Sequence, residues 1–289
     1  MTAEAQFQAA MASAGLMPPE TIYGDGQLRR FGVGGKSCWY VLHLDGISAG
    51  SYGNWKTGHT ETWSAKSKLD MTDSERQATW VRMKAANRQR EAERDRIQAE
   101  AAARALAIWT AATPAIEHSY LTRKSIQAHG IRTDGHHLFV PMRDTAGKLH
   151  SIQTIDSDGE KRFLPGGRVK GCYFAIGKPA GGVTLCEGVA TGSTIYEATG
   201  GAVAVCFSSG NLLAVALALR DKYPDMSITV AADDDFMTVG NPGMTAARAA
   251  ALAIGAKLAV PNFEGLIRGP KDSDWNDMAR LIREKETAS

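Results

Sequence analysis

The sequence predicts a mixed α/β protein built around a parallel sheet, and three short apolar stretches carry this prediction. Two of them, 183–186 and 228–232, are each followed at once by acidic residues, and a third, 202–207, lies between them. Short β-rich runs that alternate with helical segments indicate parallel βαβ units. We therefore expect an α/β domain over residues 181–265, preceded by a small α+β segment, a long linker helix and an N-terminal β-rich module.

Acidic residues follow two strands of this predicted sheet. Glu187 follows the first strand, and Asp233, Asp234 and Asp235 follow the last. The carboxyl ends of parallel strands form the ligand-binding edge of such a sheet, and in extended backbone Asp233 and Asp235 point the same way while Asp234 points opposite. Glu187, Asp233 and Asp235 would repel one another without a cation between them, and Mg²⁺ prefers such oxygen ligands. The alternative is that these acids only cap strand ends.

The composition is that of a soluble globular chain, with 289 residues, 44% hydrophobic and 22% charged, which is long enough for two or three domains. A net charge of +2 is too small to indicate nucleic-acid binding unless basic residues cluster locally. The four cysteines form no CxxC pair, so we expect neither a zinc site nor a disulfide framework. No signal peptide and no apolar run of roughly 18 residues is present, so we expect a cytoplasmic protein without membrane contact.

Residues 1–70 are predicted to form a β-rich module after a helix over 3–14. Its aromatic residues alternate with basic ones, and two interpretations stay open: a stacking platform for single-stranded nucleic acid, or the core of a small β domain. The residues concerned are Trp39, Tyr40, Tyr52, Trp55, Trp63, Arg29, Arg30, Lys36 and Lys56.

Residues 71–112 are predicted to form one long helix, since neither Pro nor Gly occurs from residue 71 up to Pro114. Positions 87–96 hold only polar residues and alanine, and a helix without an apolar face often bridges domains through solvent. We interpret the helix as a linker; contact of its arginines with a nucleic-acid backbone is the alternative.

Residues 113–180 are predicted to form a second mixed segment. It has a helix over 119–126, a strand over 138–144 that enters a turn, a next strand that starts at 147–149 with an alternating stretch at 152–155, and then a flexible basic loop. Its basic residues are Lys161, Arg162, Arg168 and Lys170, with Gly166-Gly167 between them. Such a loop suits contacts with phosphates. A solvated turn is the alternative.

The chain after Asp235 is predicted to contain a helix over 244–254, a last short strand at 258–261 and a C-terminal tail over 266–289 with a helix over 278–285. The tail carries Asp274 and Asp277. Two interpretations stay open: these acids join the metal site, or Asp274 or Asn276 caps the helix.

Three motifs at the acidic edge resemble those of the Toprim domain, the metal-binding α/β fold of bacterial-type primases, topoisomerases and some nucleases. They are LCEG at 185–188, AVAVCFSSGNL at 202–212 and VAADDD at 230–235, and the resemblance covers about residues 181–262. It implies a general acid/base role for Glu187 and metal binding by Asp233 and Asp235. The family often has an Asp shortly after the Glu-Gly pair, and 189–191 supplies none.

The preceding segment resembles the small N-terminal part of a primase catalytic core. The resemblance rests on 139–144, on 147–149 and on the basic stretch 161–170. The order of this segment before the Toprim-like part favours a primase over a topoisomerase. The run Asp274–Asp277 is similar to one that follows the Toprim domain in phage and plasmid primases.

The resemblance implies a phage- or plasmid-type DNA primase that makes short RNA primers on single-stranded DNA. The reaction would be nucleotidyl transfer from ribonucleoside triphosphates with Mg²⁺ or Mn²⁺, and Glu187, Asp233 and Asp235 would be its catalytic and metal-binding residues. Template or triphosphate would be held by Arg143, Lys161, Arg162, Arg168 and Lys170. No GxxxxGK[ST] motif is present, so we expect a helicase to be a separate partner. A Toprim nuclease and a non-catalytic DNA-binding accessory protein remain alternatives.

Overall fold

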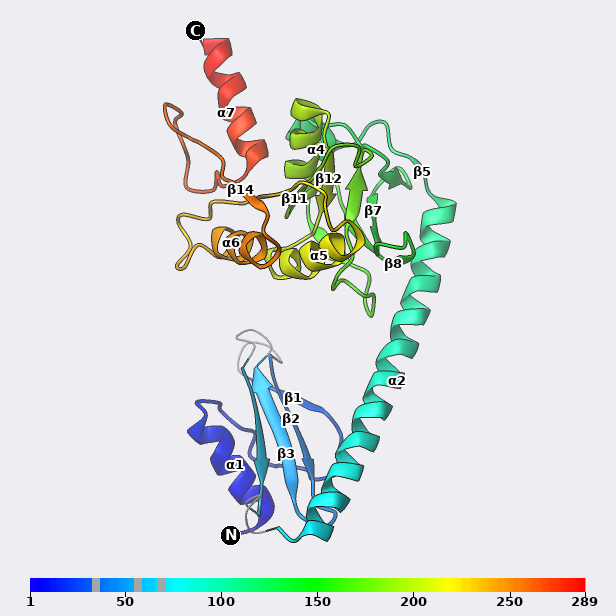
Figure 1. The fold of residues 1–289 in the computed structure, drawn as a ribbon, viewed down its shortest axis with the longest axis vertical. Coiled ribbons are helices and arrows are strands. Elements are labelled where there is room, and N and C mark those ends of the chain that lie inside the picture. The colour runs from blue at the N-terminus through cyan, green and yellow to red at the C-terminus, as the bar shows by residue number, and fades with distance from the viewer. Residues whose placement is uncertain (33–36, 55–58, 67–70, 289) are drawn as a thin grey trace. The chain divides into compact units, whose positions relative to one another are not determined.

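The structure is a computed structural model that describes residues 1–32, 37–54, 59–66 and 71–288. It divides into two compact units, Met1–Ala92 and Glu93–Ser289 (Figure 1). It contains one four-stranded and two five-stranded sheets, so the predicted mixed α/β class is confirmed. Among the described helices, none combines the length and the apolar character that crossing a membrane requires. The proposed functional division of the chain into five segments stays a prediction.

The first unit is an antiparallel sheet with one helix packed on it. Helix α1 (Ala3–Ser13) is capped by Thr2 and buries Phe7 and Met11 against the sheet. The strands, in sheet order, are β1 (Arg29–Phe31), β2 (Cys38–His43), β3 (Ala49–Asn54) and β4 (His59–Ser64).

Aromatic side chains form much of the core of this unit. Phe7 packs edge to face against Tyr40 and Tyr52, with ring centroids 6.0 and 5.6 Å apart, and both tyrosines are buried. A buried ring is not available to stack on a nucleobase, so for these two residues the core interpretation is correct. Three residues of the alternative stacking platform lie outside the described residues: Lys36, Trp55 and Lys56.

Helix α2 (Asp73–Ala111) runs from the first unit into the second and has 39 residues, roughly 60 Å at the usual rise per residue. In its last third Ala101 and Ala105 are fully buried, and Ala105 packs with Phe139 and Ile152 of the second unit. This end of the helix is therefore part of a packed core, whereas the linker role of its first part stays a prediction.

The second unit begins with an antiparallel sheet that carries helix α3 (Ser119–Lys124). Its strands, in sheet order, are β5 (Thr113–Pro114), β6 (Arg132–Thr133), β7 (Leu138–Arg143), β8 (Leu149–Ile155) and β9 (Lys161–Phe163). Strand β9 is an edge strand, and it pairs Lys161 with Ile155. Lys161 and Arg162 thus lie on a strand, so the prediction that they belong to a flexible loop is wrong; the ladder with β8 holds their backbone.

The other sheet of this unit is mainly parallel, as its sequence predicts. Its strands, in sheet order, are β10 (Phe174–Ile176), β12 (Ala202–Val205), β11 (Val183–Cys186), β13 (Ile228–Ala231) and β14 (Lys257–Ala259), and β10 alone among them is antiparallel to its neighbour. In the register of the sheet, Leu185 lies opposite Ala204 on one side and Val230 on the other. The segments that follow β11, β12 and β13 therefore emerge at one edge.

Helices cover both faces of this parallel sheet. They are α4 (Val189–Thr199), α5 (Ser209–Lys222), α6 (Pro242–Ile254) and, near the C-terminus, α7 (Trp275–Ala288). One core contains Val189 and Ile195 of α4 and extends to Leu138 of the antiparallel sheet; a second contains Leu212 of α5 and Ala247 of α6. Because the first core is shared by both sheets, the antiparallel sheet fixes strand β9 relative to the acidic edge of the parallel sheet.

Candidate metal and nucleotide site

The structure brings Glu187, Asp233 and Asp235 together at the carboxyl edge of the parallel sheet. Glu187 directly follows β11, and both aspartates follow the neighbouring strand β13. The negative charge of Asp235 acts on Glu187, and the charges of Glu187 and Asp235 act on Asp233. The sequence predicts this convergence from the parallel order of the strands alone.

One carboxyl oxygen of Glu187 and one of Asp233 are buried without a hydrogen-bond partner. Burial, followed by the charge of Asp235, raises the pKa of Glu187 to about 7. Burial, followed by the charge of Glu187, raises the pKa of Asp233 to about 8. The Oε1 atom of Glu187 and the Oδ1 atom of Asp233 accept no hydrogen bond. Because an unpartnered buried carboxylate is costly, this edge favours a bound cation.

The donor atoms fit a hard divalent cation that keeps part of its water shell. Carboxylate oxygens are the ligands of Mg²⁺, which is usually bound by one or two carboxylates plus waters or phosphates. Within the described ranges, no three His, Cys, Asp or Glu side chains are grouped so that they could hold a metal ion by themselves. Glu187, Asp233 and Asp235 are the residues of this edge that could hold such an ion.

Asp235 is anchored to the beginning of helix α6. The backbone N–H of Gly243 donates to Oδ2 of Asp235 at 3.0 Å. A Cβ atom at Gly243 would lie 2.8 Å from both this oxygen and the carbonyl oxygen of Asp233. The glycine therefore allows the helix N-terminus, with its partial positive charge, to approach the acidic segment closely.

Asp234 is held by Arg268, which donates to its carboxylate and to its backbone carbonyl. The guanidinium of Arg268 also lies between the rings of Phe236 and Phe263, 3.8 and 4.0 Å from their centroids. Burial opposes ionisation of Asp234, but hydrogen bonds from Arg268 and Asn241 outweigh it and hold its pKa below the usual value. Asp234 thus fixes the backbone that carries the site.

The C-terminal tail passes the acidic edge, where Asp274 caps helix α7, and a metal-binding role of its acids stays a prediction. Asp274 accepts a hydrogen bond from the N–H of Asp277 at 2.9 Å, and Asp277 accepts one from the N–H of Ser273 at 3.1 Å, so both acids satisfy the start of α7. Their charges also raise the pKa of Asp233. The indole N–H of Trp275 donates to the carbonyl of Ala232 at 3.1 Å and so ties the tail to the end of β13.

Among the predicted phosphate-binding residues, Lys161 faces the acids. Burial lowers the pKa of its ammonium group, while the charges of Asp274 and Asp233 oppose this effect. The ammonium also lies 5.6 Å from the centre of the Tyr120 ring. Lys161 is therefore a cation placed beside the carboxylates, although its side chain still contacts solvent.

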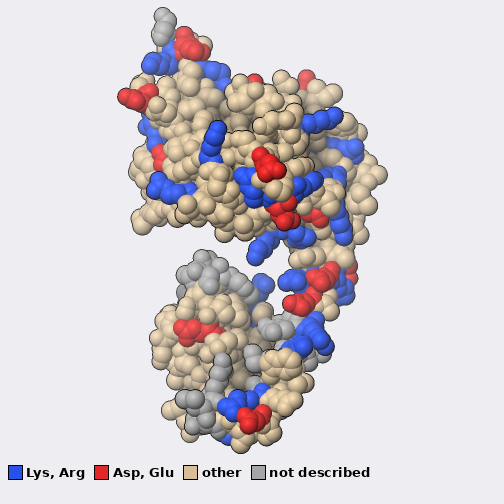
Figure 2. Space-filling view, in the orientation of Figure 1, with Lys and Arg blue, Asp and Glu red and all other residues tan. Residues whose placement is uncertain are grey.

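Three of the other predicted basic residues, Arg143, Arg162 and Arg168, have local partners. Arg162 pairs with Glu160 at 2.8 Å, and Arg168 donates to the carbonyl of Lys170 at 3.1 Å. Arg143 donates to the carbonyl of Gly147 at 2.9 Å. Arg162 and Lys170 are exposed to solvent. Figure 2 shows basic side chains gathered with a smaller number of acidic ones on part of the surface of the Glu93–Ser289 unit.

Asn211 and Arg268 have structural roles at the site that the sequence analysis did not assign. The buried side chain of Asn211 donates to the carbonyls of Cys172 and Cys206 and accepts from the N–H of Gly171. It thereby joins the basic segment to the end of β12. For Asn211 the position inside the SSGNL motif is a sequence signal, whereas nothing in the sequence pairs Arg268 with Asp234.

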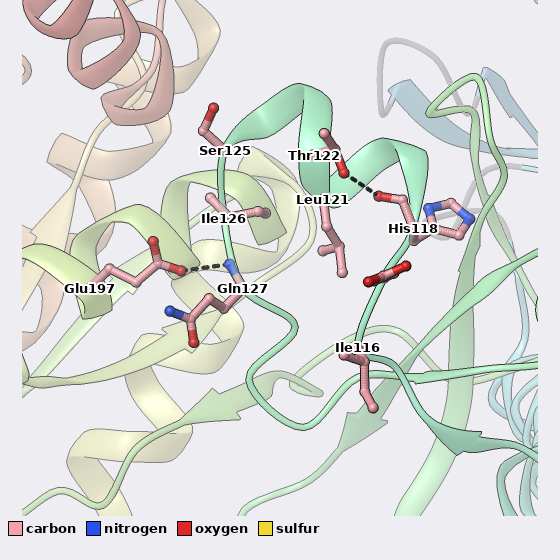
Figure 3. A pocket seen from close by; sticks show the side chains of 9 residues that line it. Ile116, His118, Leu121, Thr122, Ser125, Ile126, Gln127 and Glu197 are labelled. Atoms are coloured by element: carbon pink, nitrogen blue, oxygen red, sulfur yellow. Dashed lines mark hydrogen bonds between the residues drawn. The ribbon is translucent and has the colours of Figure 1, made fainter.

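A separate pocket of the second unit, about 300 Å³ in volume, lies beside helix α3 (Figure 3). It is lined by Ile116, Glu117, His118, Leu121, Thr122, Ser125, Ile126, Gln127 and Glu197. Glu197 is already bonded there, since it accepts from the N–H of Gln127 at 2.8 Å and contacts His129 at 2.7 Å. None of the predicted site residues lines this pocket.

Comparison with known proteins adds to the fold and to the geometry of the acidic edge. Residues 182–282 match the family model described as Toprim domain, so the match includes the Asp274–Asp277 run as well as the strands. Two curated relatives, both named DNA primase TraC and both from Escherichia coli, are each 38% identical to this chain over 287 and 291 residues. These matches confirm the resemblance to a Toprim-domain DNA primase.

The relatives are much longer than this chain. The matches cover 91% of the chain but 20% and 27% of the two TraC proteins, so the chain spans about a fifth to a quarter of their length. The primase fragment of the bacteriophage T7 primase-helicase protein is a solved structure that resembles part of the chain, with 15% identity and a TM-score of 0.44 over 61% of this chain and 74% of that one. Similarity at this level supports no further conclusion.

Proposed function

We propose that this chain is the primer-synthesising part of a DNA primase of phage or plasmid replication. It would join ribonucleotides into a short RNA on a single-stranded DNA template. The observation that carries the proposal is the pair of buried, unpartnered carboxyl oxygens of Glu187 and Asp233 at the edge of the parallel sheet that matches the Toprim model. The 38% identity to proteins named DNA primase supports it.

The reaction is nucleotidyl transfer, in which a 3′-hydroxyl attacks an α-phosphate and pyrophosphate leaves. A divalent cation, Mg²⁺ or Mn²⁺, stabilises the charge on the attacking and leaving oxygens when it is bound. Asp233 and Asp235 hold this cation in our proposal, and Glu187 either joins them or accepts the proton of the attacking hydroxyl. A pKa of about 7 suits a general base near neutral pH.

The basic residues bind the polyanionic substrates. Lys161, beside the carboxylates, is placed to neutralise the triphosphate as it approaches them. The template strand or the triphosphate is also held by Arg143, Arg162, Arg168 and Lys170. We further propose that the protein acts in the cytoplasm and that a separate helicase supplies the single-stranded template.

Incorporation of labelled ribonucleotides on a panel of single-stranded DNAs tests this function. We expect the wild-type chain to make short products with Mg²⁺ or Mn²⁺ and Glu187→Gln to make at least about a hundredfold less, which is the usual range for a lost general base. Retained synthesis by Glu187→Gln would remove that residue from the mechanism. Circular dichroism checks that the variant stays folded.

A metal-dependent nuclease built on the same carboxylates is the second candidate, since Toprim folds also occur in nucleases. It would need no nucleotide and would shorten the template in the presence of metal alone. The same panel of DNAs, labelled at the 5′ end and incubated with metal but without ribonucleotides, separates the two. A template that stays intact there, together with new products once ribonucleotides are added, supports the primase. Intact template, no products and retained DNA binding would instead support an accessory protein.

A further inference from the structure

Two phenylalanines from different sheets meet at the acidic edge of the second unit. Phe163 ends the edge strand β9, and Phe207 follows β12. Their ring centroids are 6.2 Å apart and the ring planes meet at 81°. Phe163 is 39% exposed, while Phe207 is partly buried against the core beneath α4. The Phe163–Phe207 pair is thus a supported aromatic surface that remains open to solvent.

Phe207 occupies a backbone conformation that disfavours large side chains. Its φ is 72°, in the left-handed region, where a bulky residue is uncommon and strained. A glycine at this position would reach the same turn between β12 and α5 without strain. Packing of the ring against the core and against Phe163 compensates for the strain, so the aromatic side chain has a role that a turn residue alone would not supply.

The Phe163–Phe207 pair joins the end of the basic strand β9 to the segment that follows β12 at the acidic edge. Lys161 and Phe163 are two positions apart on β9, so they share one face of the strand, and Lys161 is attracted by Asp274 and Asp233 on that face. On the other side, Phe207 stands two residues before Ser209, whose backbone N–H bonds to the Glu187 carboxylate and opposes the rise of its pKa. The aromatic surface, the lysine and the carboxylates are therefore neighbours.

A nucleotide presents both chemistries that this arrangement offers. Its phosphates suit Lys161 and a cation on the carboxylates, and its base has a flat apolar face that stacks on aromatic side chains. We propose that the Phe163–Phe207 pair stacks a nucleobase beside the acidic edge, either the base of the bound ribonucleoside triphosphate or a base of the template. This assignment rests on the proposed function, because it takes nucleotides as the substrates.

Equilibrium binding of the full 289-residue chain to probes with and without bases tests the assignment. One arm compares ATP with inorganic tripolyphosphate, and the other compares oligothymidylate with the same sugar–phosphate chain lacking bases. We expect Phe163→Ala to bind a base-containing probe roughly 5- to 150-fold more weakly, the range for loss of one aromatic stacking partner. The base-free probes should bind Phe163→Ala and the wild type alike, and Phe163→Trp should restore binding.

Two further variants keep the test decisive. Phe163→Leu retains apolar volume without an aromatic face and should lose the same preference, and Leu252→Ala, which removes an 84% exposed side chain from α6, should change nothing. Weaker binding in the ATP arm assigns the base to the incoming nucleotide, and weaker binding in the DNA arm assigns it to the template. Unchanged binding in both arms, or equal loss for probes without bases, would overturn the proposal.

The outcome is independent of primer synthesis. If the wild type binds the base-containing probes through Phe163 but makes no RNA with any template, the proposed polymerase function fails and the stacking surface stands. If synthesis is present and Phe163→Ala binds every probe like the wild type, the stacking proposal fails and the primase assignment stands.

Discussion

Arg268 donates two hydrogen bonds to Asp234, from Nη1 to the side-chain Oδ2 at 2.8 Å and from Nη2 to the backbone carbonyl at 2.7 Å. The two residues are far apart in sequence, and the bonds join the segment after β14 to the segment after β13. Because Asp234 lies between Asp233 and Asp235, the contact fixes the backbone from which both candidate ligands project. The Asp234 side chain, which bonds to Arg268, therefore holds the two neighbouring candidate ligands in place.

Arg268→Lys should destabilise the protein and loosen this segment. Lysine lacks the planar fork that bonds two acceptors at once and cannot reproduce the position between the rings of Phe236 and Phe263. We expect the free energy of unfolding in urea to fall by about 1–3 kcal/mol. Arg283→Lys, on the exposed side of α7, is the matched control and should have no effect. Equal stability of the two variants would show that the contact does not fix the segment.

Gly243→Ala should impair the site more than the fold. The added methyl group would press on the carbonyl of Asp233 and the side chain of Asp235, each 2.8 Å away. The helix N-terminus or the acidic segment must then shift, and we expect primer synthesis to fall by at least about tenfold, since small displacements at a reacting centre are costly. Gly181→Ala, where nothing lies within 4 Å, is the control. Full activity of Gly243→Ala would mean that this close approach is not needed.

Asn211→Ala should separate the basic segment from the end of β12. The Asn211 side chain makes three hydrogen bonds of 2.8–2.9 Å, with the N–H of Gly171 and the carbonyls of Cys172 and Cys206. The substitution leaves these three backbone groups without their partner. We expect a loss of about 2–4 kcal/mol in the free energy of unfolding. Asn262→Ala, at an exposed turn, should cost much less. Similar values for the two would argue that water replaces the lost bonds.

Stability in the absence of metal should fall as the pH rises through the titration of the buried carboxyls. The pKa values of Glu187 and Asp233 are raised to about 7 and about 8, so between about pH 4 and pH 8 the folded state binds more protons than the unfolded state. Each such proton contributes a slope of at most about −1.4 kcal/mol per pH unit.

Urea unfolding in EDTA at pH 5 and pH 9 measures this effect against Asp233→Asn, which lacks one of the two groups. The wild type should lose more stability than the variant between the two pH values, and added Mg²⁺ should reduce the loss, because a bound cation favours the ionised carboxylates. A difference between wild type and variant that does not change with pH would contradict the raised pKa of Asp233.

The sequence could predict the parallel sheet and the meeting of its acids. Each strand is a short buried apolar run, and the parallel order places the residues after them at one edge whatever the details of packing. The alternation of extended backbone likewise predicts that Asp234 points away from Asp233 and Asp235, and the structure pairs Asp234 with Arg268. These features depend on local pattern and on topology, which the chain displays directly.

The rest of the site depends on contacts between distant segments. The glycines at 166 and 167 predict a loop that includes Lys161 and Arg162. Pairing with β8 instead makes these two residues part of a strand. The helix predicted over 278–285 begins earlier, at Trp275, because Asp274 caps it by accepting from the N–H of Asp277, while Asp277 accepts from the N–H of Ser273 just before the helix. The left-handed backbone conformation at Phe207 could not be predicted, because the position is not a glycine. Each of these features is decided by tertiary packing.

The central claim is that the acidic edge is the site of metal-dependent primer synthesis, and Asp233→Asn tests it most directly. Labelled ribonucleotides, single-stranded DNA and Mg²⁺ or Mn²⁺ would be incubated with the wild type, with Asp233→Asn and with Asp221→Asn, whose exposed side chain lies on α5 away from the site. We predict short RNA products from the wild type and Asp221→Asn and none from a folded Asp233→Asn. Undiminished synthesis by Asp233→Asn would contradict the account.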